Sequence, residues 1–308
     1  MKLNYFSIIW VIILIVSCQS GTTLDGGTQK EFITDAPPVL VDSIALPVIV
    51  IADSTKTELK KYFSTDLIQE IENYFVEYNA ANSDTAFQNI YDSGVDLCKT
   101  LALSFQDPQT HYLKDLMSQD EYELYYLHGE MELLNGQLGP IYITCVAECS
   151  EMDFCFDLNS LSEKAISTNG KADDDFVEIL LFVEGDYGYA RYFDFKVWTK
   201  QYVDYAGSNL LGKGIMLEVV KRTKLFKEKH ELFSKQIQMV HEDFFEELTT
   251  AHGFEYSKEE VLAEIDKIIN LKYFDSDDLK VILKQYELIE AGGEYFQFNC
   301  STGECSFG

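Results

Sequence analysis

The sequence lacks the short motifs that mark several large enzyme classes. It has no G-x-x-x-x-G-K-[ST] phosphate-binding loop, no G-x-G-x-x-G dinucleotide fingerprint and no H-E-x-x-H zinc motif. His241-Glu242 is followed by Phe245 at the position where the zinc motif needs its second histidine. The nucleophile elbow G-x-S-x-G is also missing, because Gly207-Ser208-Asn209 lacks the surrounding pattern. These absences leave catalysis without positive support, and we predict no catalytic residue, no cofactor and no metal site.

Positive charge is scarce: 24 Lys and Arg stand against 52 Asp and Glu, which gives a formal net charge of −28. A general nucleic-acid binder needs a basic face for the phosphates, so we exclude nucleic acid as a partner. Lys213 to Lys235 is the one base-rich segment, and we expect it to balance acidic neighbours within the same body.

Between Asp115 and Glu163 there is no Lys or Arg at all, while acidic and aromatic residues alternate. Such a stretch predicts a surface for a basic partner protein, in which acids steer the encounter and aromatic rings supply contact area. The alternative is a solvated acidic face whose aromatic side chains are buried. The candidate contact residues are Glu121, Glu123, Glu130, Tyr125 and Tyr126.

A long hydrophobic run is missing as well. The apolar segment Phe6–Val16 follows Lys2 and is much shorter than the roughly 20 residues that a spanning helix needs. It ends in Ile15-Val16-Ser17-Cys18, which resembles the lipobox of bacterial lipoproteins. The alternative is an ordinary signal peptide that ends in a chance cysteine.

The lipoprotein resemblance covers residues 1–18 only and is not a family for the rest of the chain. It implies that residues 1–17 are a cleaved signal peptide and that Cys18 carries the lipid, so that the membrane is a partner. By the same resemblance, Gln19 after the cysteine implies the outer membrane of a Gram-negative cell, without saying which face. We therefore expect a lipid-anchored protein of the cell envelope.

Six cysteines remain after Cys18, and an even number in an oxidising compartment favours disulfides. Cys300 and Cys305 enclose a turn and are the preferred pair, in a small C-terminal hairpin. Three pairings stay open among the other four, Cys98, Cys145, Cys149 and Cys155. The spacing of the last three lacks the C-x2-C of usual zinc sites, which favours disulfides over a metal.

The predicted fold is mainly α: a single multi-helix body with a short extended N-terminal arm and the C-terminal hairpin. Residues 18–36 read as a flexible tether, 37–54 as the arm and 55–308 as the helical body. S/T-x-x-E capping patterns begin at Thr55, Ser118, Ser160 and Ser257, each before an apolar stripe of helical period. Residues 176–183 are predicted to be a helix; the alternative is an α+β fold with strands between 141 and 198.

With these features together, we predict a membrane-anchored protein-binding module of the inhibitor or immunity type. The alternative is an envelope glycan hydrolase that uses a pair of carboxyl groups, one with a raised pKa in a cleft.

Overall fold

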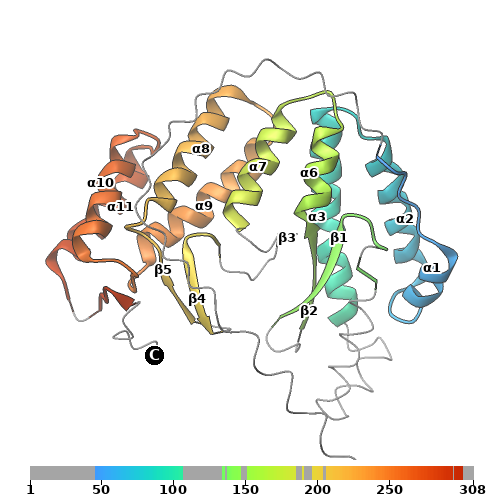
Figure 1. Ribbon diagram of the computed structural model, residues 1–308, viewed down its shortest axis with the longest axis horizontal. Coiled ribbons are helices and arrows are strands. Elements are labelled where there is room, and N and C mark those ends of the chain that lie inside the picture. Colours follow the sequence, from blue (N-terminus) through green and yellow to red (C-terminus); the bar gives the residue numbers. More distant parts are fainter. Residues whose placement is uncertain are drawn as a thin grey trace, which may run out of the picture. The chain divides into compact units, whose positions relative to one another are not determined.

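The computed structural model describes residues 46–106, 134–135, 137–146, 151–184, 189–190, 196–203, 206–293 and 295–300. By its contacts the chain divides into residues 1–42 and 43–308, and every described residue belongs to the second unit. The described residues form nine helices, one three-stranded sheet and one two-stranded sheet, which confirms the mainly α class (Figure 1). Within the described ranges, no helix combines the length and apolar character that a membrane crossing requires.

The helices and strands follow each other along the chain in this order. They are α1 (Asp53–Leu59), α2 (Thr65–Ala80), α3 (Asp84–Gln106), β1 (Ile141–Val146), β2 (Glu151–Asp157), α6 (Leu158–Ile166), α7 (Ala172–Glu184), β3 (Tyr189–Ala190) and β4 (Thr199–Val203). The rest are β5 (Ala206–Asn209), α8 (Ile215–Lys229), α9 (Ser234–Thr250), α10 (Lys258–Asn270) and α11 (Ser276–Ala291). In the C-terminal part, α8 packs on α7, α9 and α10, and α11 packs on α9 and α10.

The apolar stripe that follows the capping pattern at Thr55 is divided between two helices. Leu59 and Phe63 are buried as their stripe predicts, but α1 ends at Leu59 and α2 begins after Ser64. The Ser64 hydroxyl accepts the backbone N–H of Leu67 at 3.2 Å, so it satisfies a donor that a new helix leaves free. The capping pattern at Thr55 is wrong, because Thr55 lies inside α1 and the N-cap is Ala52.

The region between 141 and 198 holds both predicted alternatives. Strands β1 and β2 form an antiparallel hairpin with Ile141 opposite Phe156 and Ile143 opposite Phe154. These four side chains are buried, as alternating apolar residues on one face of a hairpin should be. Residues 176–183 form part of α7, as predicted. Local strands and a buried helix therefore follow each other here.

Two further capping patterns have opposite outcomes. At Ser257 the full capping box is present, since its hydroxyl accepts the N–H of Glu260 and the Glu260 carboxylate accepts the N–H of Ser257. At Ser160 the pattern is wrong: α6 begins at Leu158 and is capped by Asp157, which accepts from the N–H of Asn159. The stronger acceptor lies three residues earlier, so the helix starts earlier. The pattern at Ser118 lies outside the described residues.

Before Cys300, the C-terminal segment bonds to an inner segment of the chain. Gln297 forms a parallel bridge with Gly253, and the N–H of Cys300 donates to the carbonyl of Phe254 at 3.0 Å. Cys300 is buried. Cys305 lies outside the described residues, so the C-terminal hairpin and the Cys300–Cys305 pair stay predictions.

The cysteines of the middle region are partly constrained by the structure. Cys98 is a buried free thiol in α3, contrary to the expected disulfide. Cys145 is opposite Met152 and Cys155 is opposite Tyr142, so three residues of register separate the two cysteines. That separation is roughly 10 Å along the strands, beyond the ~7 Å between Cα atoms that a disulfide can bridge. A Cys145–Cys155 pair is therefore excluded, while Cys149 lies outside the described residues.

Candidate functional site

The predicted partner surface lies mostly outside the described residues, as do Glu121, Glu123, Glu130, Tyr125, Tyr126 and the lipid site Cys18. The end of the same base-free stretch is described. There, Phe154 and Phe156 are buried in the core and Asp153 and Asp157 are partly exposed. For these two aromatic residues the alternative interpretation, a solvated acidic face over buried rings, is correct.

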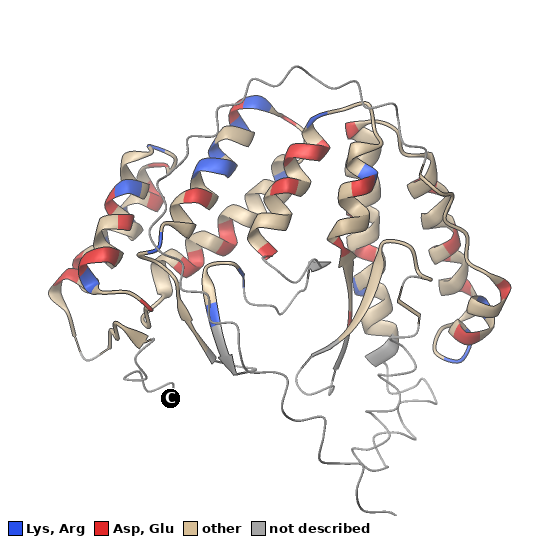
Figure 2. Cartoon of the chain, in the orientation of Figure 1, with Lys and Arg blue, Asp and Glu red and all other residues tan. Residues whose placement is uncertain are grey.

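Most bases of α8, which lies in the base-rich segment, are paired with acids of the same body. Figure 2 shows basic and acidic residues interleaved along α8. The Arg222 guanidinium lies 2.9 Å from Glu178 of α7, and the Lys229 ammonium lies 3.9 Å from Asp175 at the start of that helix. Lys221 and Lys224 also lie 3.8 and 3.9 Å from Glu218 and Glu228 of α8 itself, so four of the five bases of this helix are paired within the chain.

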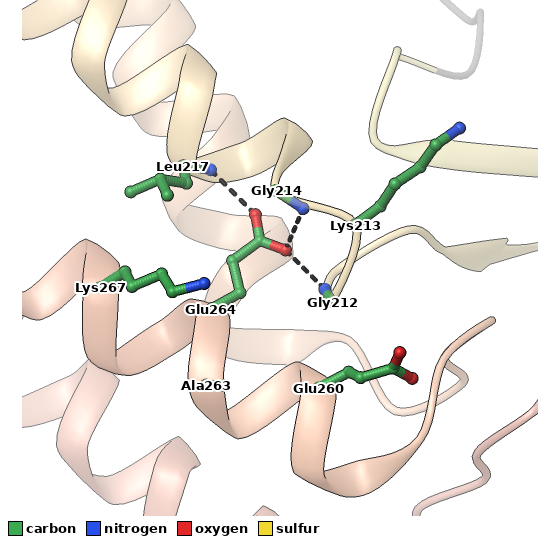
Figure 3. A pocket seen from close by; sticks show the side chains of 8 residues that line it. All are labelled: Gly212, Lys213, Gly214, Leu217, Glu260, Ala263, Glu264 and Lys267. Atoms are coloured by element: carbon green, nitrogen blue, oxygen red, sulfur yellow. Dashed lines mark hydrogen bonds between the residues drawn. The ribbon is translucent and has the colours of Figure 1, made fainter. Parts of the chain in front are cut away.

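A pocket of about 170 Å³ lies between the loop that precedes α8 and the face of α10 (Figure 3). It is lined by Gly212, Lys213, Gly214, Leu217, Glu260, Ala263, Glu264 and Lys267. Its walls are therefore the start of α8 with the loop before it on one side and one face of α10, from Glu260 to Lys267, on the other.

The centre of this pocket is an anion cradle that the protein fills itself. Oε2 of Glu264 accepts the backbone N–H of Gly212 at 2.5 Å and that of Gly214 at 2.7 Å, and Oε1 accepts that of Leu217 at 2.9 Å (Figure 3). Both glycines have positive φ, 111° and 92°, which turns successive N–H groups inward. Free N–H groups at a helix start attract anions. Here the Glu264 side chain is the anion, and it fastens α10 to the start of α8.

The sequence around this cradle matches the phosphate-binding loop motif at every fixed position except the last. Gly207 is followed after four residues by Gly212-Lys213, so only the last position, Gly214 in place of Ser or Thr, departs from a phosphate-binding loop. The order of elements also agrees, since β5 precedes the loop and α8 follows it. However, Gly207 lies inside a two-stranded antiparallel sheet, the hydroxyl that would hold a metal is missing and a carboxylate occupies the cradle. The residues present do not fit a nucleotide.

The other carboxyl group of the pocket is unsuited to proton donation. Hydrogen bonds from the hydroxyl and the backbone N–H of Ser257 lower the pKa of Glu260. A glycosidase acid requires a raised pKa. Neither carboxyl group of the pocket therefore has the environment of a general acid, since Glu264 is held by three donors.

Two neighbouring carboxyl groups, one of which has a raised pKa, lie elsewhere in the structure: Asp84 of α3 and Asp173 of α7. Burial raises the pKa of Asp173 to about 7, and its side chain is 0% exposed. Neither residue lines the pocket described above. Asp173 is fully buried, so a polymeric glycan does not reach the carboxyl group whose pKa is raised.

The histidines do not form a site together. His230 ends α8, His241 is buried in α9 and His252 follows α9, so they do not share one helix. His241 lies 3.2 Å from the Tyr273 hydroxyl and 3.4 Å from Asp278, and burial lowers its pKa. Over the described ranges, no three His, Cys, Asp or Glu side chains converge as a metal site would need.

Comparison with known protein families, with curated proteins and with solved structures finds no match.

Proposed function

We propose that this chain is a lipid-anchored binding protein of the cell envelope that holds a basic protein partner, as an inhibitor or immunity protein does. The observation that carries the proposal is the distribution of charge. The net charge is −28, and no base falls between Asp115 and Glu163. Four of the five bases of α8 form ion pairs with acids of the same body, so they do not offset that stretch.

The anchor in this proposal is the lipid on Cys18, with residues 18–36 as the tether. Stable anchoring needs more than one acyl chain, which a fully processed lipoprotein cysteine carries. Residues 1–17 are the cleaved signal peptide. The proposed location is the outer membrane of a Gram-negative cell.

The contact surface in this proposal centres on Glu121, Glu123, Glu130, Tyr125 and Tyr126. Exposed acids give a fast, salt-sensitive encounter, and aromatic rings give the buried contact area that slows dissociation. The hydrolase alternative is not proposed, because hydrogen bonds lower the pKa of Glu260 in the described pocket and Asp173, whose pKa burial raises, is fully buried.

The partner is tested by crosslinking the lipidated protein in native membranes, purifying it and identifying what copurifies. We expect one basic protein in near-stoichiometric amount, whose affinity falls as salt is raised. The triple variant Glu121→Lys, Glu123→Lys, Glu130→Lys should weaken binding at least ten-fold. The matched control reverses three exposed acids of α2, Asp66, Glu70 and Glu77, and should leave affinity within about two-fold. If the two triple variants weaken binding equally, or if affinity does not change with salt concentration, the proposal that the acidic surface binds the partner is refuted.

The anchor has a separate test. The Cys18→Ser variant should move from the membrane fraction to the soluble fraction of the envelope and should no longer incorporate a labelled fatty acid. Retention of both properties in the variant would show that another feature holds the protein at the membrane.

A further inference from the structure

The backbone of Ile49 is paired with a side chain instead of a strand. Its N–H donates to Oδ1 of Asn79 in α2 at 3.0 Å, and Nδ2 of Asn79 donates to the carbonyl of Ile49 at 2.8 Å. A residue that exchanges both bonds with one neighbour has its N–H and C=O on the same side of the chain, as in a β-strand. The amide of Asn79 therefore takes the place of a neighbouring strand.

The same arrangement occurs on β1, which is a strand of the first sheet. The N–H of Ile143 donates to Oδ1 of Asn135 at 2.7 Å, and Nδ2 of Asn135 donates to the carbonyl of Ile143 at 2.8 Å. The opposite edge of β1 is paired with β2. Both edges of β1 are therefore occupied, one by an asparagine side chain and the other by a strand.

Residues 47–51, called the edge segment from here on, have the asparagine on one side but no strand on the other. Burial alternates along the segment: Ile49 and Ile51 pack on the core, whereas Val48 and Val50 are 73% and 74% exposed. The N–H and C=O groups of these two valines point away from Asn79, because successive residues of an extended chain face opposite sides. Over the described residues none of these groups has a hydrogen-bond partner. Two donors and two acceptors are thus open to another chain.

We propose that the edge segment pairs with the same segment of a second copy of this chain, antiparallel and about a two-fold axis at Ile49. Val48 then lies opposite Val50 of the second copy, and Val50 lies opposite Val48 of the second copy. Each of these pairs exchanges two hydrogen bonds, so every open donor and acceptor of both edge segments is used. The pairing is self-complementary, as an interface between identical chains about a two-fold axis must be.

Charge favours a second copy at this place over a second copy elsewhere. The chain has a formal net charge of −28, which makes two copies repel each other. Residues 46–52 contain no charged side chain at all. Contact through the edge segment therefore adds no close pair of like charges to that repulsion.

The position of the edge segment in the chain also favours a second copy. Residues 1–45 end directly before it, so the proposed tether leads into it. Two copies that are anchored in one membrane are held at a raised effective concentration, which lets a small contact form. This concentration effect rests on the proposed anchor, whereas the pairing itself does not.

The contact is limited at both ends. Pro47 has no N–H to donate. At the other end the chain turns into α1, and the carbonyl of Ala52 accepts the N–H of Lys56 at 3.0 Å. The interface thus consists of two residue pairs, which is far smaller than a standard protein interface. We expect reversible association that increases with protein concentration.

Disulfide crosslinking of the full-length protein in detergent tests the register. Val48→Cys and Val50→Cys are prepared separately, mixed in equal amounts and oxidised with copper phenanthroline. The mixture should give at least three-fold more crosslinked dimer than either variant alone, because only unlike variants place the introduced thiols opposite each other. Equal yields from the mixture and from the single variants would overturn the proposal.

Two controls belong to this experiment. The unmodified protein, whose described free thiols Cys98 and Cys155 are buried, gives the background. Val76→Cys replaces a valine of α2 that is 69% exposed but lies outside the pairing. Mixed with Val48→Cys, it should give no more dimer than Val48→Cys alone, and a yield equal to that of the Val48→Cys and Val50→Cys mixture would overturn the proposal.

Two substitutions at Val50 separate the backbone hydrogen bonds from the side chain. Val50→Pro removes an open N–H but keeps the bonds between Ile49 and Asn79, and its thermal unfolding should confirm that it folds. In sedimentation equilibrium the dissociation constant of the dimer should rise at least ten-fold in Val50→Pro and stay within about three-fold in Val50→Thr. A folded Val50→Pro that associates as tightly as the unmodified protein would overturn the proposal.

The response to salt distinguishes this contact from the proposed basic partner. Raising NaCl from 0.1 to 0.5 M should strengthen the dimer, because salt screens the repulsion between two acidic chains. Binding of the basic partner should weaken under the same change, so failure of one proposal cannot be mistaken for failure of the other. A dimer that dissociates as salt is raised would be held by charge pairs and would overturn the proposal.

The occupant in the cell is identified with the same pair of variants. Val48→Cys and Val50→Cys, coexpressed and oxidised in native membranes, should give the same crosslinked dimer, with both chains identified by mass spectrometry. A crosslink to a different protein in its place would mean that the edge segment receives a strand of another chain, and would overturn the proposal.

Discussion

Replacing Glu264 by Gln should remove the fastening between α10 and the start of α8. The carboxylate accepts three backbone N–H groups at 2.5 to 2.9 Å, and each hydrogen bond to a charged group contributes about 1.5–3 kcal/mol. An amide oxygen in the place of Oε2 keeps the bonds from Gly212 and Gly214, but its NH₂ group then faces the N–H of Leu217, so one bond is lost and the other two are no longer made to a charged group. We expect a loss of about 3 kcal/mol in the free energy of unfolding, since the pocket lets water reach the freed donors.

The measurement is equilibrium unfolding in urea, with thermal unfolding as a second readout. A loss of about 3 kcal/mol corresponds to a fall in Tm of roughly 6–12 °C for a domain of this size. The matched control is Glu259→Gln, an exposed residue in the same helix with the same charge change, which should shift stability by no more than about 0.5 kcal/mol. If Glu264→Gln and Glu259→Gln have equal stability, the cradle contributes nothing and the reasoning is refuted.

Four other changes have defined outcomes. Gly94→Ala should cost about 1–3 kcal/mol in chemical unfolding, because a Cβ atom there overlaps the Phe156 ring; an unchanged midpoint would mean that α3 and β2 shift apart freely. Ser257→Ala should cost about 1 kcal/mol by loss of the capping box, and Ser257→Asp should restore most of it. Phe233→Ala should cost about 3–5 kcal/mol, since its ring is fully buried in an aromatic cluster; a loss below 1 kcal/mol would contradict that packing. An acid with a raised folded-state pKa contributes stability at low pH and loses it as pH rises from about 4 to about 7, so Asp173→Asn should gain in Tm relative to the unmodified protein between pH 5 and pH 8.

What the sequence predicted well depends on neighbours along the chain. The helix after Ser257 has its capping box and its buried stripe of Val261, Ile265 and Ile268 within four turns. Both signals arise from hydrogen bonds and packing at spacings of three and four residues, so they can be seen without the fold. The same pattern at Ser160 is wrong, because a better cap, Asp157, stands just before it.

What the sequence could not predict depends on pairs that are far apart in the chain. Glu264 meets a loop 50 residues earlier, and Asp84 meets a turn 89 residues later. In a chain with 52 acids, no local feature separates these two from the rest. The near match to a phosphate-binding loop at Gly212-Lys213 does indicate an anion cradle, but it cannot show that the anion comes from α10.

The two carboxylates change how the acidity of this protein should be understood. Asp84 accepts N–H groups at the start of α7, and Glu264 accepts those at the start of α8, so each neutralises the positive end of a helix that belongs to another segment. Acids used in this way are not available to a partner, although they count in the net charge of −28. A binding surface must therefore consist of acids whose carboxylates are not already hydrogen-bonded to the start of a helix. For this reason reversal of Glu121, Glu123 and Glu130 against reversal on α2 discriminates better than any comparison based on total charge.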